Sequence, residues 1–427
     1  MAKSEPAKKR NAGKYLKLSA IFFIAIVLRV TSCFLYYQAH SGIRTFEYEE
    51  VAVNLIQGNG FTFQYLNTVY RAGISPVFSA LCALIYLIFG HHHSLIVLMQ
   101  IAFNVATCAL VFFIAERFFD SKCAFLAAIL TALHPGLIIY SSTVLHSLSL
   151  YTFLLCASFF LLVVSLESHG LRHKILLGLC TGLCVLERST FLPFFVLAWF
   201  WLFYYSVNKK EAKRVILISI VSLFLIISPW VIRNTIIFKK VVFIQTNQWI
   251  AFWLGNNPQS SGTAMAPSGK HWVDACPEEF RKKLFSLDEI GQMELFKTES
   301  LTFVRQHPGQ FIGRTLKKFY YFWWFSPQAG LLYPASYLVL YKIYYAVILS
   351  GAFIGLIWAL FINRTRPLII LMLLLFSSNS FLHSLYYLEG RHRCSIEPFL
   401  LICFSFGVFQ ILGLRAMLRD KLRGEVA

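Results

Sequence analysis

The chain has 427 residues, 57% of them hydrophobic, with a mean hydropathy of +0.63 and a formal net charge of +19. Several apolar runs of roughly 20 residues exclude an ordinary soluble protein and indicate a polytopic membrane protein. The positive charge does not require a nucleic-acid partner, because basic cytoplasmic loops give a membrane protein the same excess. We therefore expect an all-α fold of about ten to twelve transmembrane helices, and no nucleic acid as a partner.

The first apolar segment, residues 18–37, follows a basic stretch at residues 1–17. It is too long for the apolar region of a signal peptide and has no small-residue cleavage site, so we interpret it as an uncleaved first span. The other apolar segments, in chain order, are 75–90, 94–115, 122–140, 147–166, 174–187, 190–207, 215–232, 337–362, 367–388 and 397–414.

Two topologies compete, and the basic loops distinguish them. If every segment crosses the membrane, residues 208–214, 363–366 and 415–427 lie outside, against the positive-inside rule. If 75–90 does not cross, every basic loop is cytoplasmic, and this segment of about 16 residues is indeed short for a crossing. We expect this second arrangement, with about ten spans, both termini cytoplasmic and 75–90 in the membrane plane or re-entrant. The aromatic-rich stretch 319–336 is an interfacial segment or a further short span.

This topology leaves two large pieces outside the membrane. One is the first outer loop, residues 38–93, and the other is polar enough for a small domain. Within the second piece, the sequence SLDE from Ser286 to Glu289 is a capping box that starts a helix, and Pro308 stops that helix. We expect a basic cytoplasmic tail at 1–17 and an N-terminal transmembrane module, which contains the outer loop, at 18–232. A non-cytoplasmic loop or small domain follows at 233–318, and a C-terminal transmembrane module with a basic cytoplasmic tail at 319–427.

Three glutamates stand close together in RTFEYEEVAVNLIQGNGF, residues 44–61, although the whole chain has only 20 acidic residues. A helix over 46–57 places Glu47 and Glu50 on one narrow polar face and Glu49 off that face. Such a helix lies in the membrane interface with its apolar side down. Acidic residues on a surface helix often do no more than solvate that helix. At the mouth of a membrane-embedded region, however, charge is usually functional.

Seven arginines lie at or near the predicted outer face, the side that normally lacks them. A single outer arginine is often an anchor for lipid headgroups. Several arginines on separate loops indicate a shared anionic ligand, and the guanidinium fork suits phosphate. Together with the glutamates they predict a general base beside a phosphate clamp. The seven are Arg29, Arg44, Arg71, Arg188, Arg233, Arg391 and Arg393.

Further motifs follow the glutamate stretch in chain order. They are ALHPGLIIYSSTVLHSLSLYTFLL at 132–155, GLCTGLCVLERSTFL at 178–192, SPWVIRN at 228–234 with WLGNNP at 253–258, and RHRCSIEP at 391–398. Together with the glutamate stretch they resemble the GT-C glycosyltransferases. The branch is the family 39-like one, which contains the dolichyl-phosphate-mannose protein mannosyltransferases and the bacterial aminoarabinose transferases. The resemblance covers roughly residues 15–415.

The resemblance implies a sugar donor linked to polyprenyl phosphate and an inverting transfer to a hydroxyl acceptor on the non-cytoplasmic face. An acid of the first outer loop acts as the base, and basic residues hold the leaving phosphate. The sequence departs from the family at two positions, because Arg44 stands where the commonest motif has Asp, and His146 stands near the place of a second acid. One branch has its acid at the position of Glu47. We therefore expect Glu47 to be the base, with Glu50 and Glu49 behind it.

The role of His146 stays open at this stage. It is a proton carrier, a group that orients the acceptor, or only a polar helix start. The asparagines of the turn motifs GNGF and GNNP either bring the backbone close to a sugar or only form turns. The catalytic candidates are Glu47, Glu50 and His146, and the candidates for substrate or phosphate binding are Arg29, Arg71, Arg188, Arg233, Asn234, Asn256, Asn257, Arg391 and Arg393.

We expect no cofactor, and a divalent metal is the less favoured alternative. The resemblance implies a branch that is generally metal-independent, and contiguous histidines such as His91–His93 seldom give tetrahedral geometry. The expected partners are the lipid-linked donor, a lipid, glycan or protein acceptor, and membrane lipids. A transporter or flippase of lipid-linked sugar, or an inactive member of the fold, is the alternative, but a transporter does not require the acid-bearing helix. The compact length favours a bacterial inner membrane.

Overall fold

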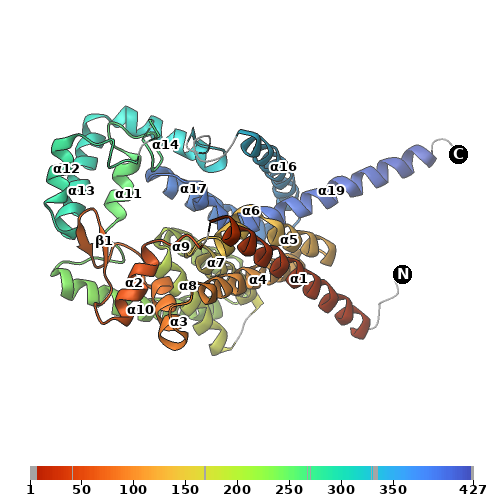
Figure 1. The fold of residues 1–427 in the computed structure, drawn as a ribbon. Helices are drawn as coiled ribbons and strands as arrows, with labels where there is room; N and C mark the ends of the chain where they lie inside the picture. The colour runs from red at the N-terminus through yellow and green to blue at the C-terminus, as the bar shows by residue number, and fades with distance from the viewer. Residues whose placement is uncertain are drawn as a thin grey trace.

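The computed structural model describes residues 7–40, 42–167, 170–266, 268–269, 271–327, 329 and 335–424. Within these ranges the chain is helical except for connecting loops and one two-stranded antiparallel sheet. Figure 1 shows the helices gathered into a bundle with a smaller helical part at one end. The outermost residues of the two predicted basic tails, 1–6 and 425–427, lie outside the described residues.

The elements follow the expected order of apolar helices interrupted by two largely polar parts. The N-terminal helix and the first outer loop contain α1 (Ala7–His40), α2 (Glu47–Ile56), β1 (Phe63–Tyr65), β2 (Thr68–Tyr70) and α3 (Pro76–Phe89). The bundle continues with α4 (His93–Phe118), α5 (Ser121–Leu133), α6 (Pro135–Ser142), α7 (Leu148–Val164), α8 (Leu171–Glu187), α9 (Leu192–Tyr205) and α10 (Lys209–Phe238). The remaining helices are α11 (Gln248–Gly255), α12 (Glu278–Phe285), α13 (Glu289–Gln306), α14 (Pro308–Trp323), α16 (Ala335–Leu360), α17 (Arg366–Leu385), α18 (Arg391–Cys394) and α19 (Glu397–Gly424).

Six helices in the described part of the chain are long and apolar enough to cross a membrane, or seven if the bent pair of α5 and α6 forms one span. The helices over 76–89, 189–205 and 397–413 are apolar but shorter. With 14 residues, α3 extends about 21 Å, less than the ~30 Å of a hydrocarbon core, which suits a segment that does not cross. The all-α membrane fold is thus confirmed, and the count of about ten crossings stays a prediction.

The predicted span 122–140 is two helices rather than one. α5 and α6 meet at His134 with a bend of 50°. Pro135 has no N–H, and the residue before a proline avoids helical backbone, so the first helix ends at Leu133. His134 Nδ1 accepts the N–H of Leu137 at 3.3 Å and caps the second helix. The break leaves carbonyl groups at the end of α5 without helical donors.

The basic segments predicted to be cytoplasmic meet at one end of the bundle. Both termini of the drawn chain lie on that side in Figure 1. The segments are linked by contacts of Lys14 with Glu116, Lys17 with Ser121, Arg117 with Glu167, Lys174 with Glu211, and Arg364 with the Arg117 carbonyl. Their shared position agrees with the second topology, although the side of the membrane on which they lie stays a prediction.

Cysteine labelling tests that topology. We expect Lys210→Cys to be protected from a membrane-impermeant maleimide in intact cells and labelled after lysis, because this exposed position at the start of α10 is predicted to be cytoplasmic. Lys283→Cys, exposed on α12, is the matched outer position and should be labelled in intact cells. The native cysteines are buried or half-buried, so the background should be low. Labelling of position 210 in intact cells would contradict the arrangement.

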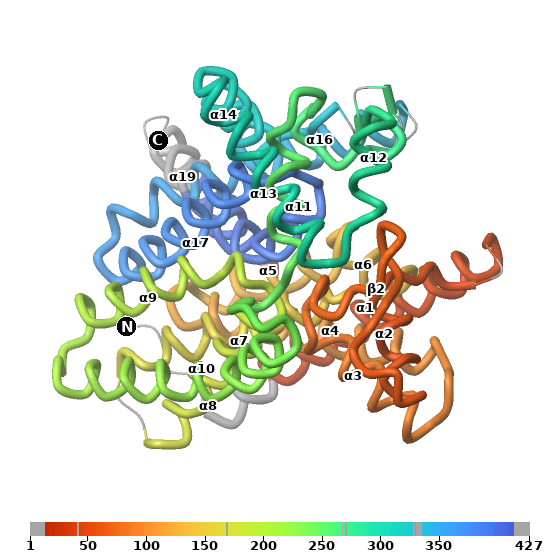
Figure 2. The backbone as a smooth tube through the Cα atoms, turned by 90° about the vertical axis from the view of Figure 1, so that its left-hand side faces the viewer, coloured from red at the N-terminus to blue at the C-terminus, as the bar shows by residue number. Residues whose placement is uncertain are grey.

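A second, smaller core joins the first outer loop to the segment between α10 and α14. The hairpin of β1 and β2, which turns at Leu66 and Asn67 with positive φ, lies beside α13 in both views (Figure 1, Figure 2). The sequence predicted a separate piece at 233–318, but the piece shares its core with residues of 51–74. The shared core consists of Val51, Phe61, Phe63, Tyr70, Ile74, Ile250, Trp253, Leu254, Trp272, Cys276, Leu284, Leu295 and Phe296.

Helix α13 begins at Glu289, the last residue of the predicted capping box. Asp288, rather than Ser286, is the N-cap and accepts the N–H of Gly291 at 2.8 Å. Ser286 instead follows the last residue of α12, and its N–H bonds to that helix. The predicted end is confirmed, since α13 stops at Gln306 and Pro308 opens α14.

The side chain of Glu289 connects three chain segments where the first outer loop meets the segment between α10 and α14. Its buried carboxylate accepts the backbone N–H groups of Arg71 at 2.6 Å and Ala72 at 3.0 Å. It also accepts the hydroxyl of Thr246 at 2.5 Å. The first outer loop, the loop after α10 and helix α13 are therefore held by one side chain.

We expect Glu289→Ala to lower the free energy of unfolding by ~3–5 kcal/mol, because each buried donor left without an acceptor costs about 1–3 kcal/mol. The measurement is the thermal or denaturant unfolding of the detergent-solubilised protein. Glu294→Ala, on the same helix but half exposed beside Lys240 and Lys297, is the matched control and should change little. Equal effects of the two substitutions would contradict the connecting role of Glu289.

Candidate active site

The three glutamates of α2 have three different environments. Glu49 contacts His91 at 3.0 Å and also His93. Glu50 accepts the N–H of Gln64 at 2.8 Å and so fastens α2 to β1. In the described part of the chain, Glu47 has no hydrogen bond or ion pair. Of the three, Glu47 is therefore the carboxylate whose oxygens remain available to a ligand.

Helix α2 is fixed by its apolar face, as its sequence predicts. Val51 and Ala52 are fully buried, and Tyr48 packs between the two cores. The preceding residues form a parallel bridge between Arg44 and Val144, with the Leu145 N–H donating to the Arg44 carbonyl at 2.9 Å. The first outer loop is therefore joined to the loop between α6 and α7, and this junction brings the glutamate helix next to His146.

His146 and Tyr48 lie together in a buried aromatic cluster. The His146 ring contacts the rings of Phe46, Tyr48 and Tyr140 in edge-on geometry, with centroids 5.3–5.6 Å apart. His146 Nδ1 accepts the N–H of Leu148 at 3.0 Å, at the start of α7. Burial, with the charges of Arg391 and Arg188, lowers the pKa of His146 well below its usual value. A neutral ring with an occupied Nδ1 carries its proton on Nε2 and is a donor rather than a base.

Two arginines from different helix ends face this cluster. Burial raises the pKa of Tyr48 to about 12, and the Glu187 charge adds to the rise, while the Ser147 hydroxyl bond, Arg188 and Arg391 oppose it. The same two arginines oppose the rise of the Tyr387 pKa. Arg188 follows the last residue of α8, and Arg391 opens α18. Both guanidinium groups therefore act on one small region, around Tyr48 and Tyr387.

The two arginines differ in their partners. Arg391 forms an ion pair with Glu389 at 2.7 Å, and both side chains remain about one-fifth exposed. Arg188 lies over the ring of Tyr151 at 5.5 Å and makes no ion pair within the described residues. An arginine without an acidic partner in a half-buried site has donors free for an anionic ligand.

Glu47 is connected to this region through Tyr65 and Tyr387. Burial raises the pKa of Tyr65 above its usual range, and the charges of Glu47 and Tyr387 contribute to that rise. Tyr387 is in turn the neighbour of Arg391 and Arg188. The candidate active site is therefore the region of Glu47, Tyr48, His146, Arg188 and Arg391, with one available carboxylate and two guanidinium groups.

Known proteins resemble this chain in part of its sequence and in its fold. Residues 74–232 match the family model described as dolichyl-phosphate-mannose-protein mannosyltransferase, a range that holds His146 and Arg188 but neither Glu47 nor Arg391. The archaeal oligosaccharyltransferase AglB from Archaeoglobus fulgidus, in complex with an inhibitory peptide and a dolichol-phosphate, superposes with a TM-score of 0.57 at 15% identity, covering 96% of this chain and 52% of that one. The chain has a GT-C-like fold. The apo structure of the Archaeoglobus fulgidus oligosaccharyltransferase gives 0.58 at 14% identity, with the same coverage.

The GT-C resemblance expected from the motifs is thereby confirmed. The chain spans about half the length of these archaeal proteins. ArnT from Cupriavidus metallidurans bound to undecaprenyl phosphate is also similar, at 13% identity with coverage of 90% of this chain and 76% of that one, but its TM-score is only 0.39. No curated protein sequence matches.

Two predicted phosphate ligands lie elsewhere in the GT-C bundle. Arg29 is fully buried and donates to the carbonyls of Ala25 and Ala132 at 3.0 Å and to Asn104 at 2.5 Å. The Ala132 carbonyl is one of those exposed by the break after α5, so Arg29 has a structural partner there. The structure therefore does not place Arg29 with the site arginines.

Arg393 is likewise enclosed. It pairs with Glu397 at 2.6 Å, donates to the Phe322 carbonyl at 2.8 Å and covers the ring of Tyr345 at 3.7 Å. Glu397 also contacts His134 at 2.6 Å. The sequence predicted an arginine cluster with only Glu389 and Glu397 as nearby acids. In the structure these two glutamates pair with Arg391 and Arg393, so neither arginine is unpaired.

The other predicted binding residues support the backbone of outer loops. Arg233 donates to the Arg71 carbonyl at 2.6 Å and lies over the ring of Trp230 at 4.5 Å. Asn234 is buried and donates to the carbonyls of Val242 and Ile244. These contacts join α10 to the first outer loop and to the loop that follows it, so the structure does not bring Arg233 and Asn234 to the site.

The GNNP turn joins α11 to the end of α17. Asn256 donates to the Leu385 carbonyl at 2.7 Å, and Asn257 donates to the Trp253 carbonyl at 2.9 Å. A Cβ at Gly255 would lie 2.5 Å from the Tyr386 carbonyl oxygen, so only glycine allows this approach. The motif therefore positions residues 386–388, which precede Arg391. The side chain of Arg71 is exposed, while its backbone bonds to Glu289 and Arg233.

Sequence reasoning missed Tyr48, Glu187 and Tyr387 as parts of the site. Glu187 accepts the Ser75 hydroxyl at 2.8 Å and the Phe78 N–H at 3.0 Å, so it holds the start of α3 beside α8. Its place directly before Arg188, at the end of an apolar segment, was the available signal. The two tyrosines gave none, because aromatic residues are common throughout this chain.

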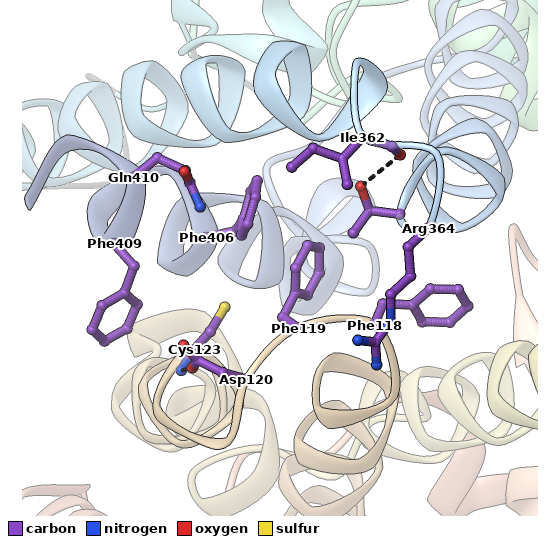
Figure 3. Close-up of a pocket in the computed structure, with 10 residues that line it drawn as sticks. Phe118, Phe119, Asp120, Cys123, Ile362, Arg364, Phe406, Phe409 and Gln410 are labelled. Atoms are coloured by element: carbon purple, nitrogen blue, oxygen red, sulfur yellow. Dashed lines mark hydrogen bonds between the residues drawn. The ribbon is translucent and has the colours of Figure 1, made fainter. Parts of the chain in front are cut away.

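A cavity lies at the opposite, basic end. It has a volume of about 480 Å³. Figure 3 shows it between the turn that follows α4, the turn that follows α16, and α19, with Asp120 and Arg364 at its edge and Phe119 and Phe406 inside. It holds none of the predicted catalytic or binding residues and is separate from the candidate active site.

Proposed function

We propose that the protein is a membrane glycosyltransferase that moves a sugar from a polyprenyl-phosphate donor to a hydroxyl acceptor. The observation that supports this most strongly is the unpaired carboxylate of Glu47 on the same short helix as Tyr48, which lies within the electrostatic reach of Arg188 and Arg391. The match of residues 74–232 to the mannosyltransferase family model and the GT-C-like fold agree with it. The AglB structure holds a dolichol-phosphate, which supports a polyprenyl-phosphate ligand for a fold of this kind.

In the proposed reaction, Glu47 accepts the proton of the acceptor hydroxyl as its oxygen attacks the anomeric carbon. The bond between that carbon and the phosphate oxygen breaks, and its electron pair stays on the phosphate. Attack from the side opposite the phosphate inverts the anomeric centre. A positioned carboxylate base contributes typically ~10²–10⁴-fold to the rate of such a step.

Arg188 and Arg391 stabilise the negative charge that grows on the leaving phosphate. Guanidinium groups suit this role because they donate two parallel hydrogen bonds to phosphate oxygens. The headgroup charge of the lipid then lies at the outer ends of α8 and α18, and its apolar tail remains in the bilayer. His146, with its proton on Nε2, and Tyr48 donate hydrogen bonds that orient the sugar or the acceptor.

We further propose that the reaction takes place on the non-cytoplasmic side of a bacterial inner membrane, without a cofactor. The acceptor is a lipid, a glycan or a protein that carries a free hydroxyl. The placement of the site at the end opposite the basic loops supports this sidedness.

The deciding experiment follows a radiolabelled polyprenyl-phosphate sugar in proteoliposomes that contain the full-length protein and a membrane extract as acceptor source. We expect the label to move to an acceptor while free polyprenyl phosphate appears. Label that crosses the bilayer still attached to its lipid would identify a transporter and overturn the proposal. Label that neither moves nor crosses, over a range of sugar donors and acceptor extracts, would indicate an inactive member of the fold.

A further inference from the structure

We propose that Glu49, His91 and His93 form a metal-binding site that takes Zn²⁺ or a similar first-row divalent ion. Their three ligand atoms lie within 4.8 Å of one another. His91 Nε2 is 3.0 Å from Glu49 Oε1, and His93 Nε2 contacts the same oxygen. This inference does not depend on the proposed function, since none of the three residues belongs to the candidate active site.

The backbone explains how neighbouring histidines converge. Gly90 ends α3 with a φ of +82°, a conformation that suits glycine. His92 then has extended backbone, with φ −122° and ψ 107°, before α4 begins at His93. In extended backbone, residues two apart point to the same side and the residue between them points away. His91 and His93 therefore share one side, whereas the ring of His92 lies against Gly90.

The turn overturns the expectation that three contiguous histidines give poor ligand geometry. Only two of the three contribute, and the third ligand comes from another helix. Two imidazole nitrogens and one carboxylate oxygen make up a donor set that zinc sites use, with a fourth position left for water. Ligands at ~2.0–2.2 Å from zinc lie roughly 3.3 Å apart around a tetrahedron. The 3.0 Å separation of His91 from Glu49 is close to that spacing.

The surroundings allow an ion to enter and hold the ligands in place. The side chain of Glu49 is 15% exposed, whereas His91 is 49% and His93 35% exposed. The His91 ring packs on Tyr86 of α3, with centroids 4.5 Å apart. The carboxylate is thus fixed, and the histidines open to solvent. Nitrogen and oxygen donors of this kind favour Zn²⁺, Co²⁺ or Ni²⁺ over Mg²⁺, which prefers oxygen ligands.

A bound ion would fasten the glutamate helix. Glu49 belongs to α2, and the histidines belong to the turn between α3 and α4, so the metal would connect these elements across the first outer loop. Glu47 lies two residues before Glu49 on the same helix. The site is therefore a positioning device for α2, and its occupancy should raise the stability of the protein by binding the native state.

The experiment uses the full-length, detergent-solubilised protein without a histidine tag, stripped of metal by a chelator that is then removed. Co²⁺ is added to follow the visible absorption of tetrahedral coordination, and Zn²⁺ binding is measured by calorimetry and by the shift in Tm. We expect one equivalent to bind to the wild type and to His92→Ala, the matched control. Affinity should fall at least ~10-fold in His93→Ala and in Glu49→Gln, which keeps the side-chain shape.

The outcomes separate clearly. Loss of the Co²⁺ spectrum and of the Zn²⁺ shift in Tm in both ligand variants, but not in His92→Ala, supports the site. Equal binding in all variants, or a loss in His92→Ala as large as in His93→Ala, would show that the ion binds elsewhere. No binding to the folded wild type at millimolar Zn²⁺ would leave Glu49 with the histidines as a plain ion pair and refute the proposal. Gel filtration of each variant shows that a loss is not due to unfolding.

Discussion

Glu47→Gln is expected to keep its fold and its affinity for the polyprenyl-phosphate donor while transfer falls ~10²–10⁴-fold, the usual contribution of a general base. The amide keeps the shape of the side chain but cannot accept the acceptor's proton. Glu47 has no partner among the described residues, so the substitution breaks no internal bond. The measurement is kcat and KM with labelled donor, where a loss in kcat alone marks a group that acts in the transition state.

The matched control is Glu50→Gln, one helical turn further along α2. Its carboxylate accepts the Gln64 N–H, a bond that the amide oxygen of glutamine can retain. Transfer should therefore stay within a few-fold of the wild type. Near-normal transfer in Glu47→Gln together with a large loss in Glu50→Gln would mean that the wrong glutamate of α2 had been assigned as the base.

Arg188→Ala is the second substitution with a large expected effect. We expect the affinity for polyprenyl phosphate to fall about 10- to 100-fold, because a hydrogen bond to a charged group contributes about 1.5–3 kcal/mol. Lysine should restore only part of the affinity, since it lacks the bidentate fork. The measurement is the binding of undecaprenyl phosphate to the solubilised variants, with transfer measured in parallel.

The same binding measurement is made on variants of Arg391 and Arg71. Arg391→Ala should also weaken binding, but it leaves Glu389 unpaired near the phosphate, so Arg391→Ala with Glu389→Gln separates lost attraction from added repulsion. Arg71→Ala is the control, because its side chain is exposed and its structural bonds come from the backbone. If Arg188→Ala and Arg391→Ala both bound the lipid phosphate as the control and the wild type do, the clamp would have to be abandoned.

The glutamate helix could be predicted from the sequence because its evidence is local. Polar and apolar residues alternate with the helical period, and the structure has α2 from Glu47 to Ile56 with Val51 and Ala52 buried. The sequence could not say which glutamate is free. That depends on Gln64 and His91, which reach the helix through a hairpin and a turn whose positions are set by tertiary packing.

The arginines show where sequence reasoning ends. Position at the end of a span led to the expectation that Arg188 and Arg391 lie at the outer face. The structure brings both to one region, and the side of the membrane stays a prediction. The same argument failed for Arg29, because a break at Pro135 exposes the Ala132 carbonyl to it inside the bundle. Lys318 is a similar case, since it is buried and donates to the carbonyls of Gly255 and Leu385, the last residues of α11 and α17. The sequence alone does not distinguish a cationic side chain that donates to the free carbonyls of a helix end from one that binds a ligand. The folded structure does.

The central claim is that Arg188 and Arg391 hold the phosphate of the donor lipid beside Glu47. The most direct test is a cryo-electron microscopy structure of the wild-type protein with bound polyprenyl phosphate. The account predicts phosphate density within hydrogen-bond distance of both guanidinium groups, with the lipid tail leaving toward the bilayer and an open path to the Glu47 carboxylate. Phosphate density at the opposite end, in the cavity beside Arg364 or elsewhere away from both arginines, would contradict it.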